Sequence, residues 1–431
     1  MTSDIITRRS DFLREEYYAF RHKSGLSVMV FPKKLTTSYA IFATRYGSVD
    51  NEFRLGSDPE FSRVPDGIAH FLEHKLFEEP DGGDAFNRFA VLGANANAYT
   101  TPDMTAFLFS GTSNFYEALG ALLDFVKTPH FTEKSVEKER GIIAQEIKMY
   151  EDHPQRAAYQ MMLENLYEKH PVRVDVAGTV GSIKKITPEL LYECCRVFYN
   201  LSNMVLVVCG DVDTDKVSAV CDEFLKGEAP VGIVRSYPEE KPEVFRAYSE
   251  RSMQASKPLF AIGMKDTALP DGGVGRMKRY AAFSILNDVL FGKSGDFYNE
   301  LYKEGLLSNQ FDFGYDSGIS YAYNGIYGES SDPEAIFERL KKVCEAAKNS
   351  VPTEDFERSK RALYASMVKG FDSTEEIANS LLSYEMIGGD IFAYTDLLAQ
   401  TTQADVTELA REMFSPEKFT LAVVKPLKKE N

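Results

Sequence analysis

The second half of this sequence repeats the order of elements that the first half predicts, and this repeat constrains the fold more than any other feature. Four segments of the second half match segments of the first in their hydrophobic pattern. The matched pairs are 39–43 with 259–263, 69–77 with 283–291, 136–149 with 356–369, and 204–209 with 419–424. A chain of 431 residues is also too long for one compact core. We therefore expect two homologous domains related by a tandem duplication.

Each half mixes short strand patterns with amphipathic helix patterns. The runs 26–31 and 38–45 are rich in β-branched and aromatic residues and flank a turn at Pro32, which predicts a β-hairpin. The segment 132–150 has a helical pattern, and the apolar run 203–209 predicts a buried strand. The expected fold class is α+β: two α/β-sandwich-like domains, each a mostly antiparallel mixed sheet packed with helices.

A proline-rich and charged stretch from Pro230 to Pro242 separates the two halves. We expect an N-terminal domain at 1–232, a linker at 233–245 and a C-terminal repeat domain at 246–431.

Composition limits the classes of partner and the compartment. A formal net charge of −16 argues against a nucleic-acid partner, which would require a basic stripe. No window offers ~20 uninterrupted apolar residues, so no membrane span is expected, and the first residues lack the apolar region of a signal peptide. The five cysteines are odd in number and irregularly spaced, which suits reduced thiols. We expect a cytoplasmic protein.

The pentad His70-Phe71-Leu72-Glu73-His74 is the strongest chemical signal in the chain. At helical spacing, His70 and His74 project from one face and can reach one metal ion, with Glu73 beside them. A zinc ion held by two imidazoles would take a third protein ligand and a water whose proton a nearby carboxylate could accept. The alternative is a pair of hydrogen-bonded core histidines. Burying three ionisable groups among apolar neighbours is costly, however, unless something binds them.

Two glutamates on the predicted helix 132–150 could complete the site. Glu139 and Glu146 are seven residues apart, so two helical turns bring them to nearly the same face, with Ile142 and Ile143 between them. The alternative is a solvated surface helix, which is the usual reading of exposed glutamates.

The repeat loses these residues in its second copy. The superposition places Ser284, Asn287, Asp288, Ser359 and Ser366 where the first half has His70, Glu73, His74, Glu139 and Glu146. The second half therefore keeps the architecture without the metal chemistry, which supports the five residues as one set.

The segment Asn97-Ala98-Tyr99-Thr100 is small and extended. It predicts a sheet edge with little side-chain bulk that could pair with an extended peptide. The alternative is an ordinary loop.

With these motifs the chain resembles the pitrilysin and insulinase family of zinc peptidases, the inverzincins, whose pentad has the order H-x-x-E-H. The resemblance extends over nearly the whole chain and is greatest to a bacterial subgroup similar to the subunits of mitochondrial processing peptidase. It implies one zinc ion per chain, bound by His70, His74 and Glu146. It also implies that Glu73 is the general base and that Glu139 assists catalysis by orienting a ligand or balancing the zinc charge.

The resemblance further implies a substrate and a setting. Family members bind a peptide as an added strand on a sheet edge, inside a chamber formed by two halves or two subunits. In this chain the edge would be 97–100, with Asn97, Ala98, Tyr99 and Thr100 contacting the substrate.

The sequence departs from the family in one stretch of its second half. Active members carry an arginine and a tyrosine in a pattern resembling L-R-x-x-x-G-L-x-Y, which hold the substrate and stabilise the oxyanion. Here Tyr302 occupies the arginine position and Ser308 falls near the tyrosine position.

Three interpretations remain open. The chain could be the metal-bearing subunit of a two-subunit endopeptidase whose related, metal-free partner supplies the missing pair. It could be a peptidase active alone or as a homodimer, with Lys303 or Tyr315 as substitutes. It could also be a non-catalytic peptide-binding or scaffold protein that retains zinc, although a structural zinc would not need Glu73.

Overall fold

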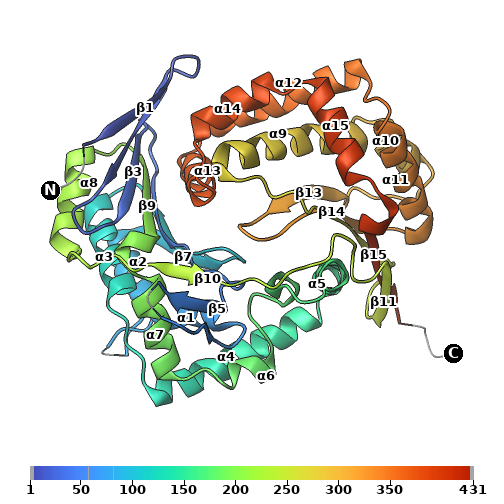
Figure 1. Cartoon of the computed structure of the whole chain (residues 1–431). Coiled ribbons are helices and arrows are strands. Elements are labelled where there is room, and N and C mark those ends of the chain that lie inside the picture. The colour runs from blue at the N-terminus through green and yellow to red at the C-terminus, as the bar shows by residue number, and fades with distance from the viewer. Residues whose placement is uncertain (1–3, 57, 81, 428–431) are drawn as a thin grey trace.

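Two domains, each a β-sheet carrying helices, face each other across the molecule (Figure 1). The computed structural model describes residues 4–56, 58–80 and 82–427. The strands of the first half and its junction are β1 Ile6–Ser10, β2 Glu15–Arg21, β3 Ser27–Pro32, β4 Ser38–Thr44, β5 Glu52–Leu55, β6 Ser62–Arg63, β7 Ala94–Thr100, β8 Thr105–Gly111, β9 Met204–Gly210 and β10 Ile233–Arg235. Its helices are α1 Ile68–Leu76, α2 Ala85–Leu92, α3 Phe115–Lys127, α4 Glu133–Glu151, α5 Pro154–Leu166, α6 Val180–Ile183, α7 Pro188–Phe198 and α8 Thr214–Phe224.

The second half contributes a smaller sheet and more helix. Its strands are β11 Tyr248–Met253, β12 Leu259–Lys265, β13 Asp312–Ser317, β14 Ala322–Glu329 and β15 Phe419–Pro426. Its helices are α9 Gly272–Phe291, α10 Asp296–Lys303, α11 Pro333–Ala347, α12 Thr353–Gly370, α13 Thr374–Met386, α14 Ile391–Gln400 and α15 Gln403–Met413.

The order of the strands confirms the duplication. The first sheet runs β1-β2-β3-β9-β4-β8-β7, and the second runs β11-β15-β12-β14-β13. In the first sheet β3 is parallel to β9, and each later pair up to β7 is antiparallel. In the second sheet β11 is likewise parallel to β15, and the remaining pairs are antiparallel. The prediction of two homologous, mostly antiparallel mixed sheets packed with helices is therefore confirmed.

The predicted hairpin at 26–31 and 38–45 is wrong, although both of its strands form. β9 lies between β3 and β4 and is hydrogen-bonded to each of them. The backbone N–H of Lys33 donates to Gly210 at the end of β9, so the intervening turn carries the chain over that strand. Every residue of β9 is buried, and its insertion makes it the central strand of the sheet.

The stretch predicted as the linker, 233–245, begins with a strand. β10 pairs antiparallel with β5 and extends a small sheet whose order is β10-β5-β6. The domain limits given above stay a prediction.

Each half supplies a helix that covers the sheet of the other half. α5 packs against β12 and β15, and α13 packs against β4 and β9. Met162 and Leu166 of α5 share a buried cluster with Ala261 of β12. Leu381 of α13 shares a different buried cluster with Ile41 of β4. The two halves thus share two apolar cores.

Gly263 of β12 shows how closely α5 approaches. A Cβ atom at this position would lie 2.8 Å from Cγ of Met162 and 3.0 Å from Cδ1 of Leu166. Only a residue without a side chain lets the helix reach this distance from the strand.

In the described part of the chain, no helix combines the length and the apolar character that crossing a membrane requires.

Candidate metal centre and active site

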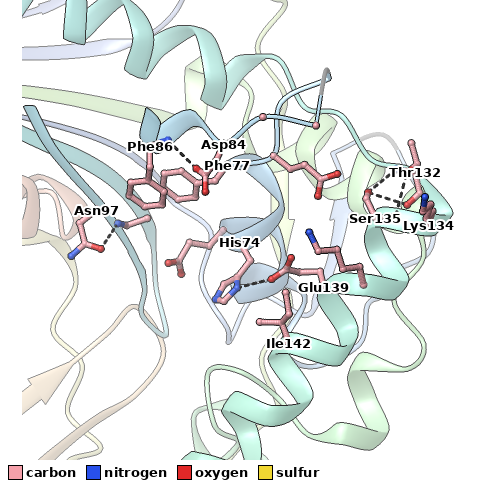
Figure 2. A pocket seen from close by; sticks show the side chains of 16 residues that line it. His74, Phe77, Asp84, Phe86, Asn97, Thr132, Lys134, Ser135, Glu139 and Ile142 are labelled. Atoms are coloured by element: carbon pink, nitrogen blue, oxygen red, sulfur yellow. Dashed lines mark hydrogen bonds and ion pairs between the residues drawn. The ribbon is translucent and has the colours of Figure 1, made fainter. Parts of the chain in front are cut away.

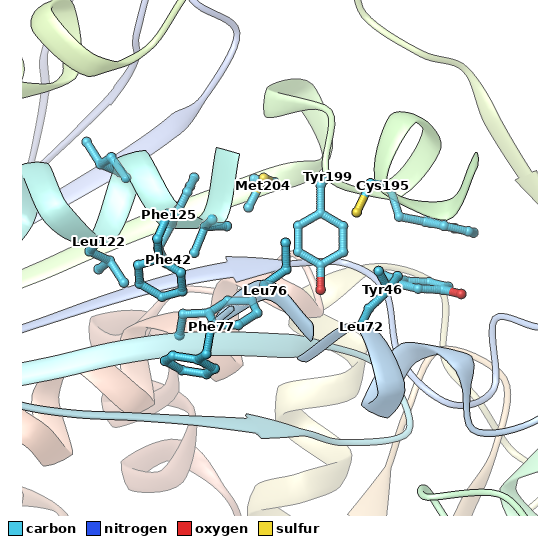
Figure 3. Packing of buried hydrophobic residues seen from close by; sticks show 14 of the residues in the cluster. Phe42, Tyr46, Leu72, Leu76, Phe77, Leu122, Phe125, Cys195, Tyr199 and Met204 are labelled. Atoms are coloured by element: carbon cyan, nitrogen blue, oxygen red, sulfur yellow. The ribbon is translucent and has the colours of Figure 1, made fainter. Parts of the chain in front are cut away.

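Helix α1 carries the predicted pentad and is fixed by apolar packing on one side. Phe71, Leu72 and Leu76 are buried in the core of the first half, and Figure 3 shows Leu72 and Leu76 among its packed side chains. Gly67, which precedes the helix, has φ 89°, and a Cβ there would lie 2.4 Å from the carbonyl oxygen of Ala177. This positive φ and close approach require glycine, and together with the packing they set the direction in which the polar residues project.

His70, His74 and Glu146, the three ligands that the resemblance implies, lie close together. One ligand atom from each lies within 4.8 Å of the others, and the two imidazole centroids are 4.6 Å apart. Nε2 of His70 is 3.7 Å from Oε1 of Glu146, and Nε2 of His74 is 3.5 Å from Oε2. Bonds of about 2.1 Å in a tetrahedron separate two ligands by about 3.4 Å. Two imidazoles and one carboxylate at these separations therefore fit a zinc ion.

Glu139 lies directly behind one of these ligands. Its Oε1 is 3.0 Å from Nδ1 of His74, and Figure 2 shows this contact with His74 between α4 and the strand that carries Asn97. A proton on Nδ1 leaves the lone pair of Nε2 pointing towards Glu146, and carboxylates commonly orient metal-binding histidines in this way. By contrast, Nδ1 of His70 is buried and has no hydrogen-bond partner among the described residues.

The surroundings of the histidines shift their pKa values in opposite directions. Burial, followed by the charge of His74, lowers the pKa of His70 to about 4, so the ring is neutral at neutral pH and one of its nitrogens has a lone pair available to a metal ion. Burial also acts to lower the pKa of His74, but the hydrogen bond and charge of Glu139 and the charge of Glu146 raise it above its ordinary value. A metal ion would compete with that proton.

Glu73 lies beside the ligands and is held by the edge strand β7. The hydroxyl of Thr100 donates to Oε2 of Glu73 over 2.6 Å. Burial raises the pKa of Glu73 above its ordinary value, although this hydrogen bond and the charge of His74 oppose the shift. Glu73 is thus a restrained carboxylate with enhanced affinity for a proton, which is the property a general base needs.

The segment 97–100 is part of β7, the last strand of the first sheet, so the alternative of an ordinary loop is wrong. Within the described residues, β7 pairs with β8 on one side and has no strand on the other. Asn97 and Ala98 line a cavity of about 820 Å³ with His74 and Glu139 (Figure 2). Ala98, Tyr99 and Thr100 line a second cavity, of about 490 Å³, with His70 and Glu146. An extended chain along β7 would pass from one cavity to the other beside Glu73.

The turn after β7 is held by residues of the second half. Asp103 accepts a hydrogen bond from the Tyr321 hydroxyl at 2.8 Å and another from the backbone N–H of Ile319 at 3.2 Å. A Cβ on Gly318 would lie 2.4 Å from Oδ2 of Asp103, so glycine is needed for this approach. The second half therefore contributes to the position of β7.

The sequence reading missed three residues around Glu146. Tyr150 donates to Oε1 of Glu146 over 2.5 Å, and the guanidinium carbon of Arg156 lies 3.5 Å from the centre of the Tyr150 ring. Two nitrogens of Arg156 contact the carboxylate of Asp175, each over 3.0 Å. The spacing of four residues between Glu146 and Tyr150 was a usable signal. The pairing of Arg156 with Asp175 is a tertiary contact, and no local sequence pattern indicates it.

The stretch around Tyr302, where the family pattern has an arginine and a tyrosine, lies outside both cavities around the proposed ligands. Tyr302 is on α10, 53% exposed, and its ring stacks on Tyr298. Tyr315 is buried and donates to Asp266 over 2.7 Å. Tyr302, Lys303 and Tyr315 are absent from the lining of both cavities around the ligands.

Known proteins resemble this chain in both sequence and fold. The model of the family described as Insulinase (Peptidase family M16) matches residues 55–180, and that of the Peptidase M16 inactive domain matches residues 185–363. The uncharacterized zinc protease YmfH of Bacillus subtilis is 39% identical over 419 residues, covering 96% of this chain and 97% of that protein. YmxG of the same organism, also described as a zinc protease, is 24% identical over 84% of this chain and 88% of its own.

Two solved structures share the arrangement of the domains. An M16-like peptidase from Alicyclobacillus acidocaldarius is 36% identical, with a TM-score of 0.92 and coverage of 98% of this chain and 99% of its own. A protease from Helicobacter pylori is 19% identical, with a TM-score of 0.82 and coverage of 96% and 100%, and at that identity it shows the fold alone.

Proposed function

The chain belongs to the insulinase family of peptidases, family M16, and from that premise we propose that it is a zinc-dependent endopeptidase that cleaves peptides bound as an extended strand along β7. The observation that most supports this proposal is the convergence of His70, His74 and Glu146 beside the restrained carboxylate of Glu73. One zinc ion per chain would be held by these three ligands.

The proposed chemistry assigns a task to each polar group. A zinc ion bound there would lower the pKa of a coordinated water towards about 7 and polarise the scissile carbonyl. Glu73 accepts the proton of the attacking water and donates a proton to the leaving amine. Thr100 holds Glu73 in place, and Glu139 keeps the imidazole of His74 in the orientation and tautomer that the site needs. The free edge of β7 offers backbone groups to the peptide.

We propose that a related, metal-free chain supplies the arginine and tyrosine that this chain lacks, so that the active enzyme has two subunits. The exposed position of Tyr302 and the engagement of the Tyr315 hydroxyl with Asp266 support this division. Because the two halves of the chain share apolar cores, a chamber around the peptide would be closed by a second chain.

One observation favours a second candidate, a peptidase that acts alone or as a homodimer. Tyr150, Arg156 and Tyr159 line the same cavity as the proposed ligands, so this half has an arginine and tyrosines of its own near the proposed metal site.

A cytoplasmic location is also part of the proposal, supported by the five cysteines, all buried and unpaired.

A peptidase assay on the purified chain tests these proposals. Unstructured peptides are incubated with the zinc-loaded chain, first alone and then mixed with candidate partner chains, and cleavage is followed by mass spectrometry. Cleavage only in a mixture supports the two-subunit enzyme, and cleavage by the chain alone supports the second candidate. Glu73→Gln should abolish cleavage in either case, and Glu137→Gln, on an exposed part of α4, is its matched control. A chain that binds zinc but cleaves under no condition would overturn the peptidase proposal.

A further inference from the structure

We propose that Tyr150, Arg156 and Asp175 form a positioning network that holds Glu146 in the orientation a metal ion requires. The inference rests on the proposed zinc site and adds residues to it that touch no metal themselves. All three residues line the cavity of about 490 Å³ that Glu146, the proposed third ligand, also lines.

The first contact fixes the carboxylate. Tyr150 lies one helical turn after Glu146 on α4, and its hydroxyl donates to Oε1 over 2.5 Å. Oε2, which is 3.5 Å from Nε2 of His74, remains free of this bond.

The second contact fixes the tyrosine. The guanidinium of Arg156, near the start of α5, lies over the Tyr150 ring at 3.5 Å from its centre. A cation above the face of an aromatic ring is attracted by the electrons of the ring and restricts its rotation. The contact with Arg156 therefore restricts rotation of the Tyr150 ring, and the hydroxyl of Tyr150 stays within hydrogen-bond distance of Glu146.

The third contact fixes the arginine and balances its charge. Asp175 binds Nε and Nη2 of Arg156 in a two-pronged arrangement, each over 3.0 Å. An unpaired guanidinium near the site would repel a divalent cation, and the carboxylate of Asp175 offsets that repulsion. The network thus orients Glu146 while adding little net charge.

Asp175 also connects the network to the helix that carries the other two ligands. Its Oδ1 accepts a hydrogen bond from the backbone N–H of Ala177 over 2.9 Å. The carbonyl of Ala177 in turn lies against Gly67 at the start of α1. The relative positions of α1 and α4 are therefore linked through one loop.

Two of the three proposed ligands then have a polar support, Glu139 behind His74 and Tyr150 behind Glu146. Tyr159 provides a matched control, because it lines the same cavity but its hydroxyl lies 2.6 Å from that of Tyr323 and contacts no ligand. A general effect of losing any tyrosine hydroxyl from this cavity would appear in both variants.

The test measures zinc affinity by competition with a chromophoric chelator. Tyr150→Phe removes only the hydroxyl and should weaken zinc binding about 10-fold to 100-fold, as loss of such supporting contacts does elsewhere. Tyr159→Phe should bind zinc as the wild type does. Because the three residues act in series, Tyr150→Phe combined with Arg156→Gln should weaken binding no more than the stronger single change.

Thermal unfolding of the zinc-free protein separates positioning from structural support. Tyr150→Phe should leave the Tm of the zinc-free form unchanged and reduce only the increase in Tm that zinc produces. Unaltered zinc affinity in Tyr150→Phe would overturn the inference, as would an equal fall in Tm with and without zinc. A wild-type chain that binds no zinc would instead overturn the proposed function, so the two failures are distinguishable.

Discussion

Acid should destabilise this protein through one buried histidine at the junction of its two halves. His170 is 1% exposed, and its Nε2 lies 3.0 Å from the hydroxyl of Ser320 in the second half. Its Nδ1 accepts a hydrogen bond from the backbone N–H of Val172 over 3.1 Å. Burial lowers the pKa of His170 from 6.5 to about 4, with Glu240 raising it and Lys265 lowering it by smaller amounts. The folded protein therefore holds this imidazole neutral.

The sign and size of the effect follow from proton linkage. Between pH 6.5 and pH 4 the unfolded chain binds a proton at this position and the folded chain does not, so stability falls as pH falls. A difference of roughly 2.5 pH units is worth about 3 kcal/mol at full protonation of the unfolded state, at about 1.4 kcal/mol per unit. Roughly 2 kcal/mol of this would be lost between pH 7 and pH 5.

Urea denaturation at pH 7 and pH 5 measures this contribution. The free energy of unfolding of the wild type should fall by about 2 kcal/mol more than that of His170→Gln over this interval, because glutamine takes up no proton. His130→Gln, which removes a partly exposed histidine outside the junction, is the matched control and should behave as the wild type does. An equal fall in the wild type and His170→Gln would refute the reasoning.

Three further predictions concern the metal, the base and the junction. Glu146→Gln should lose most of the zinc that elemental analysis finds in the wild type, whereas Glu137→Gln should retain it; zinc in full in the first variant would refute the assignment of the third ligand. Thr100→Val removes the hydrogen bond to Glu73 and should lower kcat by about tenfold with zinc content intact, since a loss of about 1.4 kcal/mol of transition-state stabilisation has that effect; an unchanged kcat would show that the bond does not matter. Leu166→Ala should cost about 3 kcal/mol of unfolding free energy by leaving a cavity in the core shared by the two halves, and a cost below about 1 kcal/mol in urea denaturation would contradict that packing.

The parts of the fold that could be predicted are those that depend on local spacing. The pentad and the glutamates of α4 followed from helical periodicity, and α4 extends over most of the range that this periodicity predicted. The hairpin prediction failed because β9 enters the sheet from a point far along the chain, and no local pattern records that insertion. Arg156 and Asp175 escaped notice for the same reason, since their side chains meet only through the tertiary fold.

The second half keeps the packing of the duplicated fold around the positions that correspond to the proposed ligands. Ser284 and Ser366, which correspond to His70 and Glu146, line a cavity of about 310 Å³. A serine at the wall of a cavity leaves the surrounding core intact, whereas Phe283 and Leu286 on the same helix remain buried in that core. Serine at these two positions is therefore compatible with the packing that the second half shares with the first.

The second half contributes contacts that hold the sheet of the first half and the turn after β7 in place. Its helix α13 packs on the face of the first sheet opposite the one that α1 and α3 cover, and Tyr321 holds Asp103 in the turn after β7. That turn directly follows Thr100, whose hydroxyl restrains Glu73. A change at the junction of the halves can therefore reach Glu73, the proposed general base, through one strand, without passing through the proposed metal ligands. The second half, which matches the inactive domain of the family, is thus a structural support for the proposed active site.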